Sequence, residues 1–92
     1  MAATKKRERL EVIRDIIKTI NQNRKIKPTR LMFYSNLSPQ MFKDYINELI
    51  TKGFIKLEVG DDDKKFFSLT KKGQDFLIEY KSIENFIENF GL

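Results

Sequence analysis

The fold is decided by residues 53–69, which read GFIKLEVGDDDKKFFSL. Apolar and polar side chains alternate from Ile55 to Val59, and apolar residues return from Phe66 to Leu69. A repeat of about two residues is typical of β-strands, and a glycine followed by aspartates is typical of a turn. The stretch therefore predicts a two-stranded β-hairpin that turns at residues 60–63.

The segment before the hairpin has the pattern of a helix over residues 38–52. Ser38 followed by Pro39 is a strong helix start, because the serine oxygen can accept from an early backbone N–H and proline has none to leave unpaired. Gly53 suits the left-handed residue that ends many helices. Its apolar residues recur three and four apart and predict the face that packs in the core: Phe42, Tyr45, Ile46, Leu49 and Ile50.

Two more helices are predicted further upstream. Residues 7–21 carry one apolar stripe, made of Leu10, Ile13, Ile16, Ile17 and Ile20. Residues 21–27 are polar and basic and predict a loop. Pro28 then suits the first turn of a short helix over residues 28–34, which would bury Leu31, Met32 and also Tyr34 before stopping at Ser35 and Asn36.

Downstream of the hairpin, Thr70 can cap a helix that runs nearly to the C-terminus. The predicted class is mainly α with a small β-hairpin, in the order α-α-α-β-β-α, which is that of a winged helix-turn-helix with an extended C-terminal helix. We interpret the chain as a single domain, with a core at residues 1–73 and a closing helix at residues 70–92.

The composition excludes most catalytic and metal sites. The 92 residues contain neither cysteine nor histidine, which removes thiolate and imidazole ligands, disulfides and the common nucleophile–base pairs. A site made only of carboxylates stays open in principle, but no convergent acidic pair is visible. We predict a protein that is not an enzyme and needs no metal, cofactor or small molecule. With no apolar run long enough for a membrane span or a signal-peptide core, we expect an intracellular, cytoplasmic protein.

The net charge of +5 is unevenly distributed. Residues 1–30 hold ten lysines and arginines against three acids, and residues 64–73 add four lysines with no acid. Residues 31–63 and 74–92 are each net acidic. A polyanion would therefore meet the N-terminal third and the lysines near residue 65. A solvated basic surface explains the charge alone equally well.

The face of helix 38–52 opposite its apolar stripe carries groups that can read base edges. A helix of this length fits the major groove of DNA, where glutamine and asparagine can pair with adenine and lysine with guanine or phosphate. Asp44, with Glu48 beside it, would cost affinity near phosphates unless it accepts from a cytosine amino group or pairs with a cation such as Lys43. The DNA-binding residues we predict are Lys27, Thr29, Arg30, Ser35, Asn36, Gln40, Lys43, Asn47, Lys64 and Lys65. Ordinary solvated helix faces and loops remain the alternative.

The hairpin tip favours a second hypothesis. Asp61, Asp62 and Asp63 would be repelled by phosphates, so the hairpin would touch DNA only through Lys64 and Lys65. A protein-interaction module, in which these acids and the aromatic residues of the last helix bind another protein, is therefore kept open.

The last helix has a heptad-like apolar seam made of Phe76, Tyr80, Ile83, Phe86, Ile87 and Phe90. The domain core needs only the first half of this helix, so the rest would leave an apolar patch that small proteins usually cover with a partner. We predict a homodimer through a short coiled coil. The alternative is that all these side chains pack on their own domain.

Residues 8–81 resemble a known family, the archaeal winged-helix regulators and chromatin-associated proteins that dimerise through an elongated C-terminal helix. Three segments carry the resemblance: residues 9–13 (RLEVI), residues 27–32 (KPTRLM) with 35–38 (SNLS), and residues 69–73 (LTKKG). The resemblance implies a nucleoid-associated homodimer that binds double-stranded DNA, as a transcription regulator or a chromatin protein. The acidic hairpin tip and Asp44 favour a site-selective regulator.

Overall fold

The computed structural model describes residues 8–92 and contains four helices and three strands in this part of the chain. In chain order they are α1 (Arg9–Asn23), β1 (Lys25–Ile26), α2 (Pro28–Ser35), α3 (Pro39–Thr51), β2 (Ile55–Val59), β3 (Lys65–Leu69) and α4 (Lys71–Asn89). The predicted order of helices and hairpin is confirmed, and every predicted helix is present.

One small core holds the elements together. It is formed by Val12, Ile13, Ile16, Ile17, Ile20, Ile26, Leu31, Phe42, Ile46, Leu49, Ile55 and Phe67. Five of these belong to α1, which crosses the middle of the molecule and touches α2, α4, β1 and β3. Burying apolar surface stabilises a fold by about 25 cal/mol per Å². Since α1 supplies the most core residues, it contributes the most to this stabilisation.

The prediction of a loop over residues 21–27 was wrong. Helix α1 continues to Asn23, and Lys25–Ile26 form a short strand that pairs antiparallel with β3. The sheet order is β1-β3-β2, with Lys25 opposite Ser68 and Ile55 opposite Leu69. A two-residue strand has no alternation to detect, and only the contact of buried Ile26 with the core places it in the sheet.

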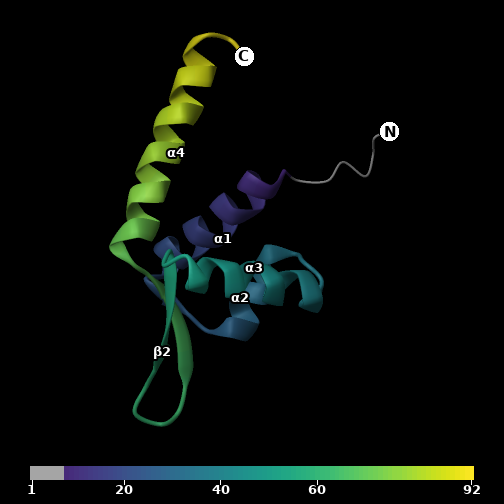
Figure 1. The fold of residues 1–92 in the computed structure, drawn as a ribbon, viewed down its shortest axis with the longest axis vertical. Helices are drawn as coiled ribbons and strands as arrows, with labels where there is room; N and C mark the ends of the chain where they lie inside the picture. Colours follow the sequence, from purple (N-terminus) through teal and green to yellow (C-terminus); the bar gives the residue numbers. More distant parts are fainter. Residues whose placement is uncertain (1–7) are drawn as a thin grey trace.

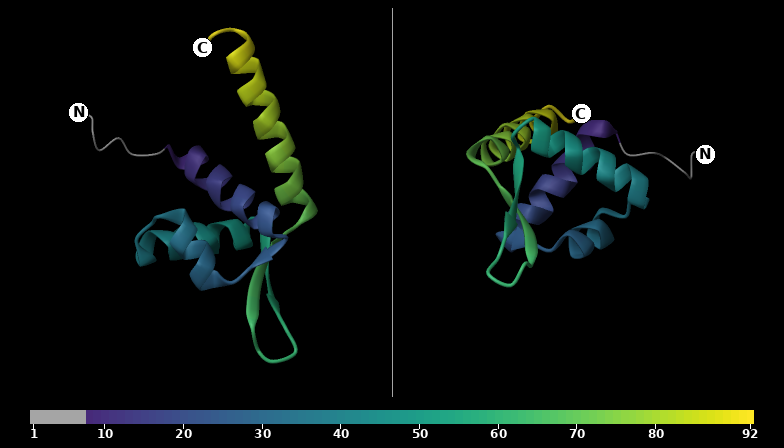
Figure 2. Two further views of the ribbon diagram at one scale, coloured as in Figure 1. Left: turned by 180° about the vertical axis from the view of Figure 1, so that it is seen from behind. Right: turned by 60° about the horizontal axis from the view of Figure 1, so that its bottom comes forward.

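Two parts project from the body in opposite directions (Figure 1). The β2–β3 hairpin extends from one end, and the outer half of α4 extends from the other, while α1, α2 and α3 pack between them (Figures 1 and 2). The described part of the chain spans 49 Å along its longest axis. This shape separates the surface of α3 and the hairpin from the free end of α4.

A tight corner joins the hairpin to α4. The Thr70 hydroxyl donates to the carbonyl oxygen of Gly53 at 2.6 Å and accepts from the backbone N–H of Gly73 at 3.2 Å, which confirms the predicted cap. Lys72 donates to the carbonyl of Lys52 at 2.8 Å, and its ammonium lies 4.6 Å from the centre of the Phe54 ring. The TKKG sequence of residues 70–73 therefore binds the end of α3 to the start of α4.

Candidate nucleic-acid interface

Helix α3 begins as its sequence predicts and presents one polar face to solvent. Ser38 caps the helix by accepting from the N–H of Met41 at 3.2 Å, and Pro39 occupies the first turn. The buried side chains are Phe42, Ile46 and Leu49. The prediction of Ile50 as a core residue was wrong, because it is 38% exposed at the edge of the helix. Tyr45 is only half-buried.

The side chains predicted to read DNA from α3 are all exposed. They are Gln40, Lys43 and Asn47, with Asp44 and Thr51 beside them. The side-chain amide of Gln40 donates to a carboxylate oxygen of Asp44 at 3.0 Å. This bond fixes both groups one turn apart, and it leaves the second Asp44 oxygen and the Gln40 carbonyl as hydrogen-bond acceptors.

Glu48 is turned away from this polar face by two cations. Its carboxylate accepts from Arg9 of α1 and from Lys52, the latter at 2.8 Å. The hydrogen bonds from Arg9 and Lys52 lower the pKa of Glu48 from 4.5 to about 2. The network attaches the start of α1 to α3 and neutralises an acid that would otherwise repel phosphate.

We expect Glu48→Gln to flatten the dependence of stability on acid pH. A carboxyl group whose pKa is lowered on folding stabilises the fold above its unfolded pKa near 4.5, and this contribution is lost as the pH falls toward 2. Thermal unfolding of both proteins at pH 7, 4 and 2.5 measures the effect. The difference between the two melting temperatures should shrink steadily from pH 7 to pH 2.5, and a constant difference across this range would show that the network carries no such linkage.

The start of α2 places cations beside α3. Lys27 precedes the helix, and Thr29 and Arg30 are exposed in its first turn. The Arg30 guanidinium donates to the Tyr34 hydroxyl at 3.2 Å and lies 5.6 Å from the centre of that ring. Tyr34 is 49% exposed and does not join the core as predicted. Its ring instead holds Arg30 in one orientation at the surface.

The two residues predicted as DNA contacts in the turn between α2 and α3 differ in their exposure. Asn36 is exposed and takes the left-handed conformation that ends α2, with φ of 56°. Ser35 is only 5% exposed, and its hydroxyl donates to the carbonyl of Met32 at 2.7 Å and accepts from the N–H of Leu37 at 3.3 Å. Ser35 therefore shapes the turn and is not available to a phosphate.

The lysines of the hairpin differ in their surroundings. Lys64 lies 3.4 Å from a carboxylate oxygen of Asp62, so part of its charge is compensated inside the tip. Lys65 is exposed and has no acidic partner among residues 8–92. Of the two predicted hairpin contacts, Lys65 is the better placed to attract a polyanion.

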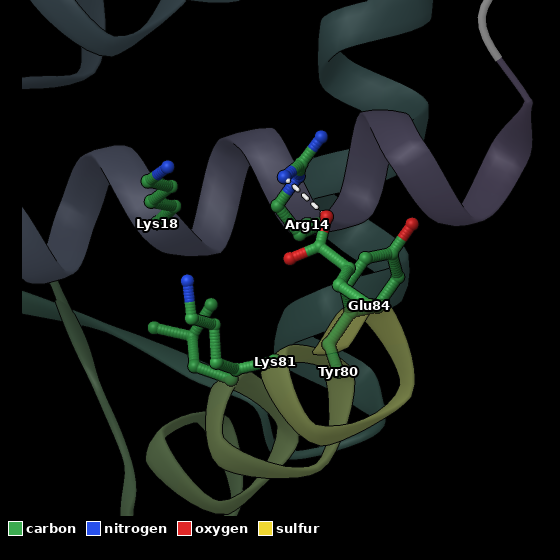
Figure 3. A pocket seen from close by; sticks show the side chains of 6 residues that line it. Arg14, Lys18, Tyr80, Lys81 and Glu84 are labelled. Atoms are coloured by element: carbon green, nitrogen blue, oxygen red, sulfur yellow. Dashed lines mark hydrogen bonds and ion pairs between the residues drawn. The ribbon is translucent and has the colours of Figure 1, made fainter. Parts of the chain in front are cut away.

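The first half of α4 is fastened to the body. Phe76 packs edge-on against Phe54 with ring centres 5.8 Å apart, and Arg14 of α1 forms an ion pair with Glu84 at 2.9 Å. The Arg14 guanidinium also lies 5.4 Å from the centre of the Tyr80 ring. Figure 3 shows the Arg14–Glu84 ion pair and Tyr80 beside a cavity of about 230 Å³ between α1 and α4. They set the direction in which α4 leaves the domain.

Within residues 8–92, no other element covers the apolar side chains at the outer end of α4. Ile83 is 57% exposed, and Phe86, Ile87 and Phe90 are exposed as well. An apolar groove follows this face and is lined mainly by Leu10, Phe76, Tyr80, Ile83 and Ile87. Phe76 and Tyr80, predicted as dimer contacts, are half-buried against their own domain and form the base of the groove.

Three exposed apolar residues were not singled out as surface features from the sequence. Leu10 was expected in the core face of the first helix but is 58% exposed at the rim of the groove. Met41 lies on α3 next to Gln40, and Phe33 lies on α2. Both fall just outside the buried stripe of their helix, which is the signal that could have identified them.

Membrane and metal sites find no support in the described part of the chain. None of its helices combines the length and apolarity that crossing a bilayer requires. Within residues 8–92, acidic side chains do not gather in a group of three or more that could hold a metal ion.

Comparison with known proteins agrees with this architecture. The model of the winged helix-turn-helix family matches residues 6–88. An uncharacterised protein of Methanocaldococcus jannaschii is 41% identical over 69 residues, and the match covers 75% of this chain and 65% of that protein. This chain thus spans slightly less than two thirds of that relative.

Solved structures share the fold at low sequence identity. Sso10a-2, described as a DNA-binding protein from Sulfolobus solfataricus, superposes with a TM-score of 0.72 at 21% identity, over 91% of this chain and 85% of that one. A MarR family transcriptional regulator from Silicibacter pomeroyi superposes with a TM-score of 0.74 at 17% identity, over 87% of this chain and 56% of that one. With the family model matching most of its length, the chain belongs to the winged helix-turn-helix family.

Proposed function

We propose that this protein is a transcription regulator that binds double-stranded DNA as a homodimer, with α3 in the major groove and α4 as the dimerisation helix. The observation that carries the proposal is the exposed polar face of α3 beside the exposed cations at the start of α2. In helix-turn-helix proteins the second helix of the motif enters the major groove and the first crosses the phosphate backbone.

The proposed interface divides into two kinds of contact. Lys27, Thr29, Arg30 and Asn36 are exposed and would hold phosphates, and Lys65 of the hairpin would reach a neighbouring stretch of backbone. Gln40, Lys43 and Asn47 are exposed on α3 and would reach base edges. Lys64 would contribute less because Asp62 competes for its ammonium. Ser35 is left out of the interface.

The dimer is supported by the exposed apolar face of α4. Ile83, Phe86, Ile87 and Phe90 form one continuous stripe with the groove beside Leu10. In a dimer with twofold symmetry, the same surface of each copy covers that of the other. Such a dimer would remove the stripe of both chains from water. Residues 70–92 would then act as the dimerisation part of the domain, and the remainder as the DNA-binding part.

We expect the double variant Arg30→Ala, Lys43→Ala to bind random duplex DNA about tenfold or more weakly at low salt. Each lost phosphate contact also lowers the slope of log affinity against log salt by about one, because fewer counterions are released. Fluorescence anisotropy at several salt concentrations measures both quantities. Lys56→Ala is a matched control that removes an exposed cation from β2 instead.

The same assay separates the proposal from the alternatives. Neutralising Asp61, Asp62 and Asp63 to asparagine should leave DNA binding unchanged or stronger, since the acids repel phosphate. Flat binding curves of the wild-type protein at low salt would contradict the proposal and favour a protein-interaction module. Equal, salt-sensitive affinity for all duplexes would instead indicate a chromatin protein.

A further inference from the structure

Met41 is an apolar side chain in the first turn of α3 that the fold does not use. It is 49% exposed and lies at the edge of the stripe that Phe42, Ile46 and Leu49 bury. Its backbone is held by the Ser38 cap, which accepts from the Met41 N–H at 3.2 Å. The N-terminal residues of a recognition helix are those that reach base edges, so Met41 stands where a specificity contact is made.

The groups around Met41 are unusual because they mostly accept hydrogen bonds. Asp44 lies one turn away on the same side of the helix, and Gln40 donates to it at 3.0 Å. This leaves one carboxylate oxygen of Asp44, the amide oxygen of Gln40 and one Gln40 N–H for other hydrogen bonds. The exposed face of α3 carries no arginine, the residue that most often recognises guanine. Its one lysine is Lys43.

The chemistry of base pairs in the major groove then restricts what this surface can bind. Guanine presents two acceptors there, which would face the Asp44 carboxylate unfavourably. Adenine and cytosine each present an amino group that can donate to it. Thymine presents a methyl group, the one apolar feature of the groove and the natural contact for a methionine side chain.

We infer that Met41 is a specificity residue that packs on the methyl group of a thymine, while the Gln40–Asp44 pair accepts from the amino group of a neighbouring adenine or cytosine. This inference rests on the proposed DNA-binding function. It makes Asp44 part of the recognition surface, where it disfavours guanine, and it predicts that the preferred site contains a thymine that cannot be replaced without loss.

The test replaces thymines by deoxyuridine in a duplex selected by the protein from a random pool. Uracil keeps the base pair and removes only the methyl group. For the wild-type protein, replacing one particular thymine per half-site should weaken binding by about three- to tenfold, the effect of exposing a methyl-sized apolar contact. Replacing other thymines should change binding much less.

Substitutions of Met41 assign this effect to its side chain. Met41→Ala should bind the thymine duplex about as weakly as the uracil duplex, so that the preference disappears. Met41→Leu keeps an apolar side chain and should retain the preference. Arg30→Ala is the matched control from the phosphate contacts, and it should weaken binding to both duplexes equally. Since Met41 is half exposed, circular dichroism should show that its variants fold normally.

Each outcome decides the inference. Indifference of the wild-type protein to every uracil replacement, or an unchanged thymine preference in Met41→Ala, would overturn the role of Met41 while leaving DNA binding intact. Equal affinity for all duplexes would overturn it as well. Absence of binding to any duplex at low salt would overturn the proposed function itself, and the inference with it.

Discussion

Replacing Ile83 and Ile87 together by glutamate is expected to convert the protein to a monomer and to lower its affinity for a two-half-site duplex by about 100- to 10 000-fold. Both side chains lie on the exposed stripe of α4, at 57% and 41% exposure. Two pairs of opposed carboxylates would replace apolar contact in the proposed dimer. Each subunit would then bind its half-site without the effective concentration that the second subunit supplies.

Mass in solution by light scattering, together with anisotropy on one- and two-half-site duplexes, measures this prediction. Ile78→Glu is the matched control, because Ile78 is also exposed, at 67%, but lies on the other side of α4. That variant should remain dimeric and bind DNA normally. A double variant that keeps the dimer mass would show that the stripe is not the interface, whatever the result with DNA.

Gly73→Ala is expected to destabilise the domain by about 2–3 kcal/mol and to lower its melting temperature by roughly 10–20 °C. A β-carbon at this position would lie 2.3 Å from the carbonyl oxygen of Phe54 and 3.3 Å from a methyl group of Leu69. The Phe54 carbonyl is fixed backbone that also accepts from the N–H of Thr70 at 3.2 Å. Relieving the clash must therefore move α4 away from the end of α3.

Urea and thermal unfolding followed by circular dichroism measure the loss. Gly60→Ala is the control, because a β-carbon there would meet its nearest atom, the carbonyl oxygen of Lys64, at an ordinary 3.5 Å. That variant should stay within about 1 kcal/mol of the wild-type protein. If Gly73→Ala were equally mild, the close approach of α4 to Phe54 would not exist in solution.

The helices were predictable because each carries its own evidence. The stripe of α1, the cap of α3 at Ser38 and the end of α2 at Asn36 all depend on residues within a few positions of one another. The same is true of the alternation that predicts β2 and of the turn that follows it. The exposed polar face of α3 follows directly, since burying one side of a helix leaves the other outside.

The errors occur where two distant segments decide the outcome. Ile26 forms a strand only because β3 lies beside it, and the Ser35 hydroxyl is buried only because the turn folds over it. Leu10 and Ile50 continue the apolar periodicity of their helices but lie beyond the part that the neighbouring elements cover. Periodicity gives the direction of a side chain, and coverage depends on what packs against it.

The sequence alone thus determined the four helices, the hairpin, their order and the polar face of α3, because these follow from local hydrogen-bonding and helical or strand repeats. Only the tertiary structure decided which of those side chains remain available. In the folded chain Glu48 forms ion pairs with Arg9 and Lys52, and Gly73 packs against the carbonyl of Phe54, 19 positions earlier in the chain. Contacts of this kind depend on the path of the chain through space, which no local repeat encodes.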